Sequence, residues 1–463
     1  MNKVHGGSNI LVQLFGSPSA TTKRVYYTAL ASLGLYILAP TINNIFQKLI
    51  SGKPKDIPGG RLDRVTSGLE NRANDCYANS SLQSLAASDT LAQYLQDFIE
   101  SLEEESAESP IFPMHTALAT LLKELREPVT VSRILSAKHV KQVARFLHSA
   151  NLRSTQQEDA HEFTQQVLDS LQEEYSHWPG RDATPFPFSG RTGTQLVCLT
   201  CGRSSEMQEQ PFTIYEAAAP QTYSAELSSI LSQEQTEVIE GYKCLCCNVI
   251  RLLENERRLG PRTNEPTIGR EALEYLREVR DTIDINSEIP AHFMEYIKQY
   301  SRGGCIPYSH SSQVHRRTVI TDAPRILLIH LSRSMYNGGG SGSSVRNGCR
   351  ITYELELGVE DAAQPWTYKL CALTKHTGTH YSGHYQAYRR KLDLVKVVGS
   401  EEVVNRSVPG YAKQPGSRHK RIRSVVQKPF WKISDSSVSE ASAATVLGET
   451  KYVYMLYYER EGL

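Results

Sequence analysis

The sequence lacks an excess of charge of either sign: its 463 residues include 51 Lys and Arg and 50 Asp and Glu, for a formal net charge of +1. That balance argues against a dedicated nucleic-acid-binding protein, which needs an excess of basic side chains. Cysteine is scarce, with nine residues in the whole chain, which excludes a disulfide-stapled scaffold. A mean hydropathy of −0.40 excludes a protein with many membrane spans but leaves room for a single anchor.

One segment is long and apolar enough to cross a membrane. The 23 residues from Val25 to Gln47 include no Asp, Glu, Lys, Arg or His. As a helix rising ~1.5 Å per residue they would extend about 35 Å, more than a hydrocarbon core of about 30 Å. A buried core helix and a signal peptide are the alternatives, but the run has little polar face and 24 residues precede it. We predict an N-terminal tail over 1–24 and a transmembrane anchor over 25–47.

The rest of the chain is predicted to be a linker and one mixed α+β domain. Residues 48–66 combine Pro, Gly and charge, as linkers do, and their basic side chains favour a cytosolic C-terminal side. The domain is expected over 67–460, with insertions near 253–317 and 391–428. Helical periodicity marks 79–98, 114–126, 155–176 and 271–279, and strand-like runs mark 193–198, 325–331, 367–374, 384–388 and 451–458.

The insertion at 391–428 is basic, with four cationic side chains close together. This composition suits contact with anionic lipid beside the anchor, or a solvated, disordered insertion. The second interpretation is the more ordinary one. The four residues are Arg418, Lys420, Arg421 and Arg423.

The segment GLENRANDCYANSSLQSL, 68–85, has the features of a nucleophile site. Cys76 follows a turn-rich stretch and precedes a helical pattern. Backbone N–H groups and the helix dipole at such a position favour a thiolate, the form in which cysteine attacks a carbonyl. Asn71, five residues upstream, can offer a side-chain amide to an oxyanion. A lone cysteine near a helix start is more often a small buried apolar residue, so the assignment needs a second motif.

The second motif is HTGTHYSGHYQAY at 376–388, in which His384 opens a strand-like run. A histidine beside a cysteine, with a third group that orients the ring, makes a nucleophile and general base. Ser434 and Asp435 in FWKISDSSV are the candidates for the third group. Because neighbouring side chains of an extended segment point to opposite faces, only one of the two can easily reach the ring.

Two further cysteine pairs have the spacing of a metal site. Cys198 and Cys201 form one CxxC pair, Cys244 and Cys247 form another, and 42 residues separate the pairs. Four thiolates suit a closed tetrahedral zinc site. Cys246 lies inside the second pair and is an alternative ligand, although a bystander role fits better.

With these motifs in place, the chain resembles the ubiquitin-specific proteases, a family of papain-like cysteine peptidases. The segments QEDAHEF (157–163), APRILLIHLSR (323–333) and YVYMLYYER (452–460) match further family blocks, in order along the chain. The family also has one conserved motif around its cysteine and one around its histidine, which segments 68–85 and 376–388 resemble. The matching residues are Gly68, Leu69, Asn71, Cys76, Tyr77, Asn79, Ser80, Leu82, Gln83, His376, Gly378, Gly383, His384, Tyr385 and Tyr388.

The resemblance implies a fold of fingers, palm and thumb and hydrolysis of the isopeptide bond after the C-terminal Gly-Gly of ubiquitin. It implies that Cys76 is the nucleophile, His384 the general base and Asn71 the oxyanion-hole side chain, with structural zinc in the fingers. Asp159 resembles the carboxylate that meets the basic ubiquitin tail. Asp159 also fits a purely structural role at a helix start, where Thr155 and Glu158 form the pattern of a capping box.

The sequence departs from the family at the third triad position, where Asp or Asn is usual. Spacing from Trp431 places Ser434 there, although Asp435 is adjacent. A serine at this position after an N-terminal membrane segment is similar to the branch of the family anchored in the mitochondrial outer membrane; the endoplasmic reticulum is the second choice.

The expected partners are therefore ubiquitin, ubiquitylated proteins and a membrane, with no nucleic acid. The alternative function is a catalytically weak ubiquitin-binding tether at a membrane, against which the intact Cys76, His384 and Asn71 argue.

Overall fold

The computed structural model describes residues 61–72, 74–103, 112–147, 158–178, 184–233, 237–261, 267–336, 344–378, 383–399, 402–408 and 418–461. All of them belong to one unit, Arg61–Leu463. The predicted tail and anchor, and the linker up to residue 60, lie outside the described residues. Within the described ranges, no helix is both long and apolar enough to span a bilayer.

The centre of the unit is an eight-stranded sheet in the order β20-β19-β15-β14-β21-β9-β5, with β13 paired to β14. Its middle strands are apolar and buried on both faces, as in the run ILLIHLS of β9. Most neighbours are antiparallel, whereas β5 and β9 are parallel. The strands are β5 (Ile214–Ala218), β9 (Ile326–Ser332), β13 (Glu356–Glu360), β14 (Pro365–Gly378), β15 (Gly383–Arg390), β19 (Phe430–Ser434), β20 (Ser437–Ala441) and β21 (Val453–Arg460).

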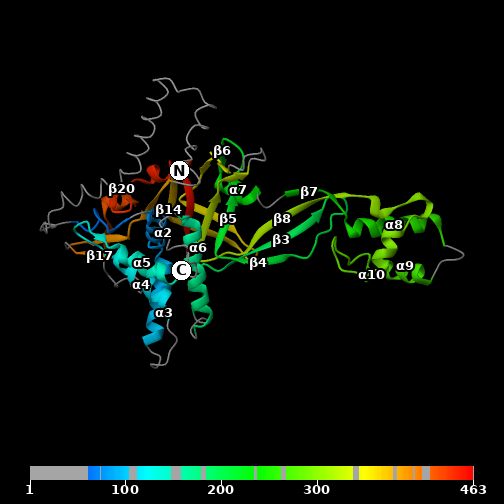
Figure 1. The fold of residues 1–463 in the computed structure, drawn as a ribbon, viewed down its shortest axis with the longest axis horizontal. Coiled ribbons are helices and arrows are strands. Elements are labelled where there is room, and N and C mark those ends of the chain that lie inside the picture. Colours follow the sequence, from blue (N-terminus) through cyan, green and yellow to red (C-terminus); the bar gives the residue numbers. More distant parts are fainter. Residues whose placement is uncertain are drawn as a thin grey trace, which may run out of the picture. The chain divides into compact units, whose positions relative to one another are not determined.

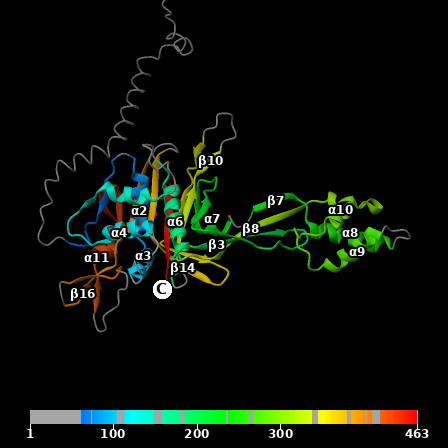
Figure 2. The same ribbon diagram turned by 60° about the horizontal axis from the view of Figure 1, so that its bottom comes forward.

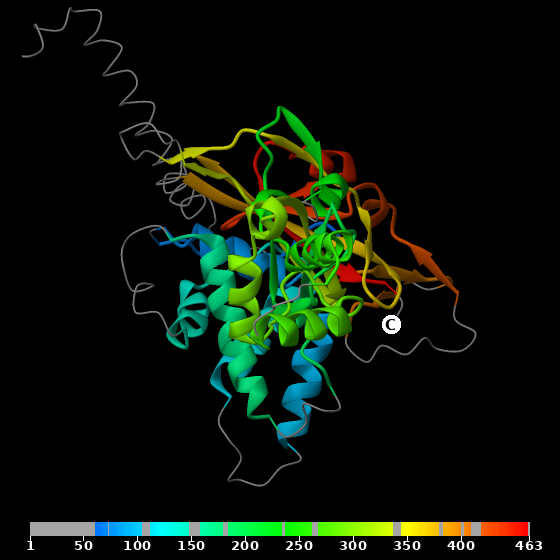
Figure 3. The same ribbon diagram turned by 90° about the vertical axis from the view of Figure 1, so that its right-hand side faces the viewer.

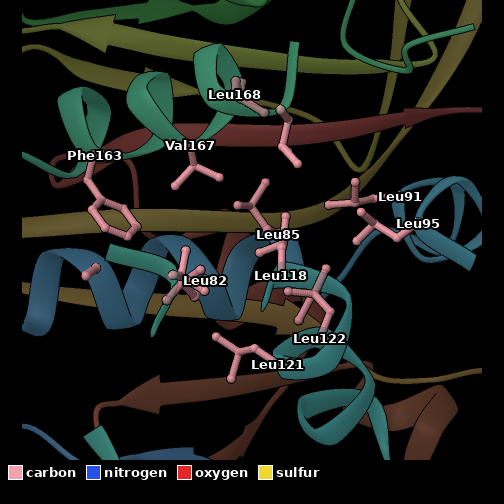
Figure 4. Close-up of a cluster of buried hydrophobic side chains, with 14 of the residues drawn as sticks. Leu82, Leu85, Leu91, Leu95, Leu118, Leu121, Leu122, Phe163, Val167 and Leu168 are labelled. Carbon is pink, nitrogen blue, oxygen red and sulfur yellow. The ribbon is translucent and has the colours of Figure 1, made fainter. Parts of the chain in front are cut away.

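Helices from the first part of the domain pack beside this sheet (Figure 3). Every residue of α2 is buried, because α2 contacts α6 and α4 as well as strands β14 and β15. Leucines of α2, α3 and α4 meet Phe163, Val167 and Leu168 of α6 in one apolar cluster (Figure 4). The elements are β1 (Gly68–Leu69), α2 (Cys76–Leu85), α3 (Asp89–Glu103), α4 (Pro113–Arg126), β2 (Ile134–Leu135), α5 (Ala137–Arg145) and α6 (Ala160–Ser176).

Two helix predictions need correction. The pattern at 79–98 is two helices, because the chain turns at 86–88 and the Ser88 hydroxyl accepts a hydrogen bond from the Leu91 N–H, 3.0 Å away, at the start of α3. The pattern at 155–176 begins only at Ala160, and Asp159 itself caps α6. The N-cap of α6 is thus Asp159 and not Thr155 of the predicted capping box, and Thr155 itself lies outside the described residues.

A four-stranded sheet, β4-β3-β8-β7, runs between the central sheet and a helical group (Figure 1). The predicted insertion at 253–317 belongs mainly to this helical group. The group has its own apolar core, which includes Val249, Leu252, Leu273 and Ile297. The bounds are β3 (Gly190–Cys198), β4 (Gln208–Phe212), β7 (Glu237–Tyr242), α8 (Leu245–Leu259), α9 (Thr267–Val279), α10 (Ala291–Gln299), the 3-10 turns η3 (Arg302–Gly304) and η4 (Pro307–Ser309), and β8 (Ser312–Asp322).

The basic stretch at 391–428 is folded where the structure describes it. Three short strands pair in the order β17-β16-β18, and α11 follows them (Figure 2). A wholly disordered insertion is thus ruled out for these residues. The remaining elements are β6 (Ser224–Glu226), α7 (Leu227–Gln233), β10 (Ser334–Tyr336), β11 (Ser344–Arg346), β12 (Arg350–Thr352), β16 (Leu394–Val397), β17 (Val403–Asn405), β18 (His419–Arg421), α11 (Arg423–Gln427) and α12 (Ala443–Leu447).

Candidate active site

Cys76 is the first residue of α2, the position that the sequence predicts for it. The preceding residue, Asp75, makes no side-chain capping bond to the helix. The first backbone N–H groups of α2 and the positive end of its dipole therefore lie beside the sulfur, which favours negative charge on it. The cysteine is buried, with an exposed fraction of 4%.

His384 lies on the strand that α2 packs against. It is the second residue of β15, where it is the register partner of Thr377 on β14. Its Nε2 atom is 2.7 Å from the hydroxyl oxygen of Ser434, the last residue of β19, which pairs with β15 on the other side. Burial lowers the pKa of His384 below the usual histidine range, while the charge of Asp435 acts in the opposite direction. A neutral ring held by one nitrogen can accept a proton at the other.

Asp435 does not extend toward the same nitrogen but points to two asparagines. Its carboxylate accepts hydrogen bonds from Nδ2 of Asn79, at 2.7 Å, and from Nδ2 of Asn71, at 3.1 Å. The backbone makes this possible, because Asp435 adopts φ of 51° at the turn between β19 and β20. Burial raises the pKa of Asp435, although both hydrogen bonds favour its charged form.

Asn71 is therefore held from two sides. Its amide N–H group binds Asp435, and its side-chain oxygen accepts a hydrogen bond from the Asp75 backbone, 3.2 Å away. The backbone of Gly68 lies so close to this turn that an added Cβ would be 2.9 Å from the Asp435 carbonyl oxygen. The glycine allows β1 and the β19–β20 turn to meet, which puts Asn71, Asp435 and Ser434 in one site.

Asp159 lies near this site on a different element. One carboxylate oxygen accepts hydrogen bonds from the backbone of His161, at 2.6 Å, and of Glu162, at 3.4 Å, as the N-cap of α6. The other accepts from the Tyr454 hydroxyl, at 2.6 Å, and the Tyr385 hydroxyl, at 3.3 Å. The pKa of Tyr385 is raised by burial and by Asp159, with a smaller contribution from Cys76. Tyr385, which follows His384 on β15, thus links Asp159 to the strand that carries His384.

The sequence reasoning gave no role to several of these contacts. Asn79 follows Cys76 by three residues, a spacing that places both on one side of α2. From this spacing the sequence could have predicted that Asn79 lies near the site. Tyr385 and Tyr454 lie in the matched motifs, but only the folded chain brings their hydroxyls to Asp159.

The four predicted metal ligands come together at the far end of β3. Cys198 ends β3, Cys201 lies in the turn after it, Cys244 is the N-cap of α8, and Cys247 is in the first turn of α8. The Cys198 and Cys247 sulfurs are 3.7 Å apart, as are those of Cys201 and Cys244, and all four lie within 4.8 Å of one another.

These separations fit four sulfurs in tetrahedral coordination around one ion. Sulfurs bound to zinc at about 2.3 Å lie roughly 3.8 Å apart. Gly202 closes the first knuckle, with φ of 72° and a hydrogen bond from its N–H to the Cys198 carbonyl at 2.9 Å. Cys246 is buried beside the cluster but is not one of the four convergent sulfurs.

Known proteins match both the sequence and the fold. The family model for ubiquitin carboxyl-terminal hydrolases matches residues 67–458. Ubiquitin carboxyl-terminal hydrolase 16 of Saccharomyces cerevisiae is 32% identical over 500 residues, which cover 96% of this chain and 98% of that protein. Ubiquitin carboxyl-terminal hydrolase 30 of Xenopus tropicalis is 22% identical, covering 86% of this chain and 81% of that protein.

Solved structures share the α+β fold at low sequence identity. A deubiquitinating module of SAGA bound to monoubiquitin aligns with a TM-score of 0.53 and 16% identity, over 92% of this chain and 76% of that chain. A SAGA module bound to ubiquitin aldehyde aligns with a TM-score of 0.52 and 17% identity, over 92% of this chain and 75% of that chain. The predicted α+β fold is thereby confirmed. Because the family pattern extends over most of the chain and one relative matches along nearly its whole length, the protein belongs to the ubiquitin carboxyl-terminal hydrolases, as a cysteine-type deubiquitinase.

Proposed function

We propose that the chain hydrolyses the isopeptide bond after the C-terminal Gly-Gly of ubiquitin, with Cys76 as nucleophile and His384 as general base. The observation that carries this assignment is the 2.7 Å contact between His384 Nε2 and the Ser434 hydroxyl, on strands that pack against the helix beginning at Cys76. With Nε2 held by Ser434, Nδ1 is the nitrogen left to exchange a proton with the sulfur.

The reaction follows in two halves. His384 takes the thiol proton, and the Cys76 sulfur attacks the carbonyl carbon of the last ubiquitin glycine. The tetrahedral intermediate collapses as His384 returns the proton to the leaving lysine amine, which leaves a thioester. Water, deprotonated by His384, then attacks the thioester, and ubiquitin leaves with a free carboxylate while Cys76 regains its thiol.

Asn71 stabilises the oxyanion that forms in both halves. Its contacts with Asp435 and with the Asp75 backbone fix the amide plane before substrate arrives. A donor that is already oriented costs no reorganisation during the reaction, and removal of one such donor typically costs about 100- to 1000-fold in rate. Asp435 acts as a positioning residue through Asn71 and Asn79.

Ubiquitin is the substrate and binding partner in this proposal. Support comes from the family match and from two neighbours of the same fold that were solved with ubiquitin or ubiquitin aldehyde. Asp159 attracts the basic ubiquitin tail with its charge, while its four internal hydrogen bonds fix its orientation.

Zinc held by Cys198, Cys201, Cys244 and Cys247 has a structural role. A bound ion would tie the end of β3 to the start of α8 and add no step to the reaction. The proposal is supported by the sulfur separations and by the fit of four thiolates to this metal.

The segment 25–47 anchors the chain in a membrane, with the catalytic domain in the cytosol. The support is the run of 23 residues without charge or histidine. The mitochondrial outer membrane is the proposed location, with the endoplasmic reticulum second, because Ser434 and an N-terminal membrane segment occur together in the branch of the family anchored there.

Cleavage of an isopeptide-linked ubiquitin dimer tests the catalytic proposal. The full chain should release monomeric ubiquitin, and Cys76→Ala should release none while it still binds the dimer. Cys305→Ala is the matched control, because Cys305 is a partly exposed thiol in the helical group and should leave cleavage unchanged. Binding without cleavage by the unmodified chain would support the tether instead.

A further inference from the structure

A second cluster of metal-ligating side chains lies outside the thiol cluster. It consists of His161 from the first turn of α6, Glu216 from β5 and His330 from β9. Glu216 and His330 are register partners in the parallel β5–β9 pair. His161 Nε2 is 3.5 Å from Glu216 Oε1, and one ligand atom from each residue lies within 4.8 Å of the other two.

His330 is buried, and its ring nitrogens make no hydrogen bond within the described part of the chain. The residue has an exposed fraction of 8%, and neither ring nitrogen has a hydrogen-bond partner among the described residues. Two rings pack against it: His161 is stacked at 3.9 Å between centroids, and Tyr454 lies at 4.8 Å with its plane turned by 74°. Buried polar atoms without a partner are rare and often indicate an ion or water.

We propose that His161, Glu216 and His330 form a binding site for a divalent transition-metal ion. Two imidazoles and one carboxylate are a ligand set that zinc, cobalt, nickel and copper accept, with open positions left for water. The set contains no sulfur, so its preference differs from that of the thiol cluster.

Binding requires one side chain to move. The two imidazole planes lie 9° apart, and lone pairs in parallel stacked rings cannot converge on one ion. His161 is the ring that turns, because its side chain is 16% exposed and His330 is enclosed. Glu216 is 66% exposed and can follow the ion from the surface.

The position of the site suggests an inhibitory effect, which rests on the proposed function. His161 is two residues after Asp159, so a bound cation would weaken the attraction between Asp159 and a basic substrate tail. Occupancy should raise KM for ubiquitin substrates more than it lowers kcat.

Direct titration with Co²⁺ tests the site without relying on activity. The protein is the full chain with zinc in its thiol cluster and with Cys76→Ala, which removes the active-site thiol. Calorimetry and visible absorption should show one saturable cobalt equivalent with nitrogen and oxygen ligands and no sulfur charge-transfer band.

Variants decide whether these three residues hold the ion. Glu216→Gln alters an exposed side chain, preserves the fold and should weaken cobalt binding about tenfold or more. His330→Gln should abolish binding. His292→Gln, on the exposed surface of α10, is the matched control and should bind as before. The proposal is overturned if the parent protein binds no cobalt, or if Glu216→Gln binds it as tightly as the parent does.

Discussion

His384 is oriented by an uncharged neighbour: its Nε2 lies 2.7 Å from the hydroxyl oxygen of Ser434, while the adjacent carboxylate of Asp435 binds asparagines. The third position of the proposed triad is thus divided between two consecutive residues. Ser434 fixes the ring, and Asp435 supplies negative charge nearby while it holds Asn71. Asp435 has a left-handed backbone conformation at this turn, and its carboxylate binds Asn79 and Asn71.

Ser434→Ala should lower kcat/KM about 10- to 1000-fold. The nucleophile and oxyanion donor remain, so the loss is partial, and a neutral hydroxyl contributes less than a charged triad carboxylate, whose loss can cost about four orders of magnitude. Steady-state kinetics on a fluorogenic ubiquitin substrate measures the change. Ser434→Asp should retain activity where the site tolerates the charge. If Ser434→Ala leaves kcat/KM nearly unchanged, a group other than Ser434 orients the ring of His384.

Asp435→Asn should change the pH dependence of kcat/KM and weaken the support of the Asn71 side chain. Removing the carboxylate removes a charge that raises the pKa of His384, so this pKa falls further below the usual histidine range. Because the neutral ring is the proposed general base, the acid limb of kcat/KM should move to lower pH. The plateau rate should also fall, because Asn71 loses a fixed acceptor. An acid limb that moves to higher pH contradicts this account of the charge.

Cys244→Ser should remove zinc and loosen the helical group around α8. Structural zinc contributes on the order of 10 kcal/mol to folding in small zinc peptides, but here the separate apolar cores of the central sheet and of helices α2 to α6 should remain. Elemental analysis and hydrogen exchange at α8 measure the loss. Cys246→Ser is the matched control and should keep the zinc. Purified protein that holds no zinc before any substitution would rule out the site.

Deletion of residues 1–50 should give an active enzyme that no longer fractionates with membranes. The described unit begins at Arg61, so the deletion leaves it whole. Alkaline carbonate extraction of cells that express each form measures membrane association. Continued membrane association of the truncated form under these conditions would show that the anchor lies elsewhere.

The sequence predicted the local parts of the candidate site well. Cys76 at a helix start, His384 near a strand start and the two CxxC pairs are short-range patterns, and the structure has them where the motifs placed them. Strand alternation indicated that only one of Ser434 and Asp435 reaches the ring, but it gave no means to foresee the positive φ of Asp435.

What the sequence could not predict depends on long-range pairing. Asn71 and Asp435 are 364 residues apart, and β1 must meet the β19–β20 turn before they touch. His161 and His330 likewise stack only because α6 begins beside β9. The error at the start of α6 has a local cause, because Thr155 and Asp159 are both residue types that cap helices, and the hydrogen bonds from the backbone of His161 and Glu162 make Asp159 the cap.

The most direct test of the account is covalent capture at Cys76. A ubiquitin molecule with an electrophile at its C-terminus is incubated with the full chain, and intact-mass and peptide mapping locate the adduct. We predict one ubiquitin per chain, attached to Cys76, at a rate that falls with Ser434→Ala and vanishes with Cys76→Ala. No adduct, or attachment to another cysteine, would contradict the central claim that Cys76 is the catalytic nucleophile.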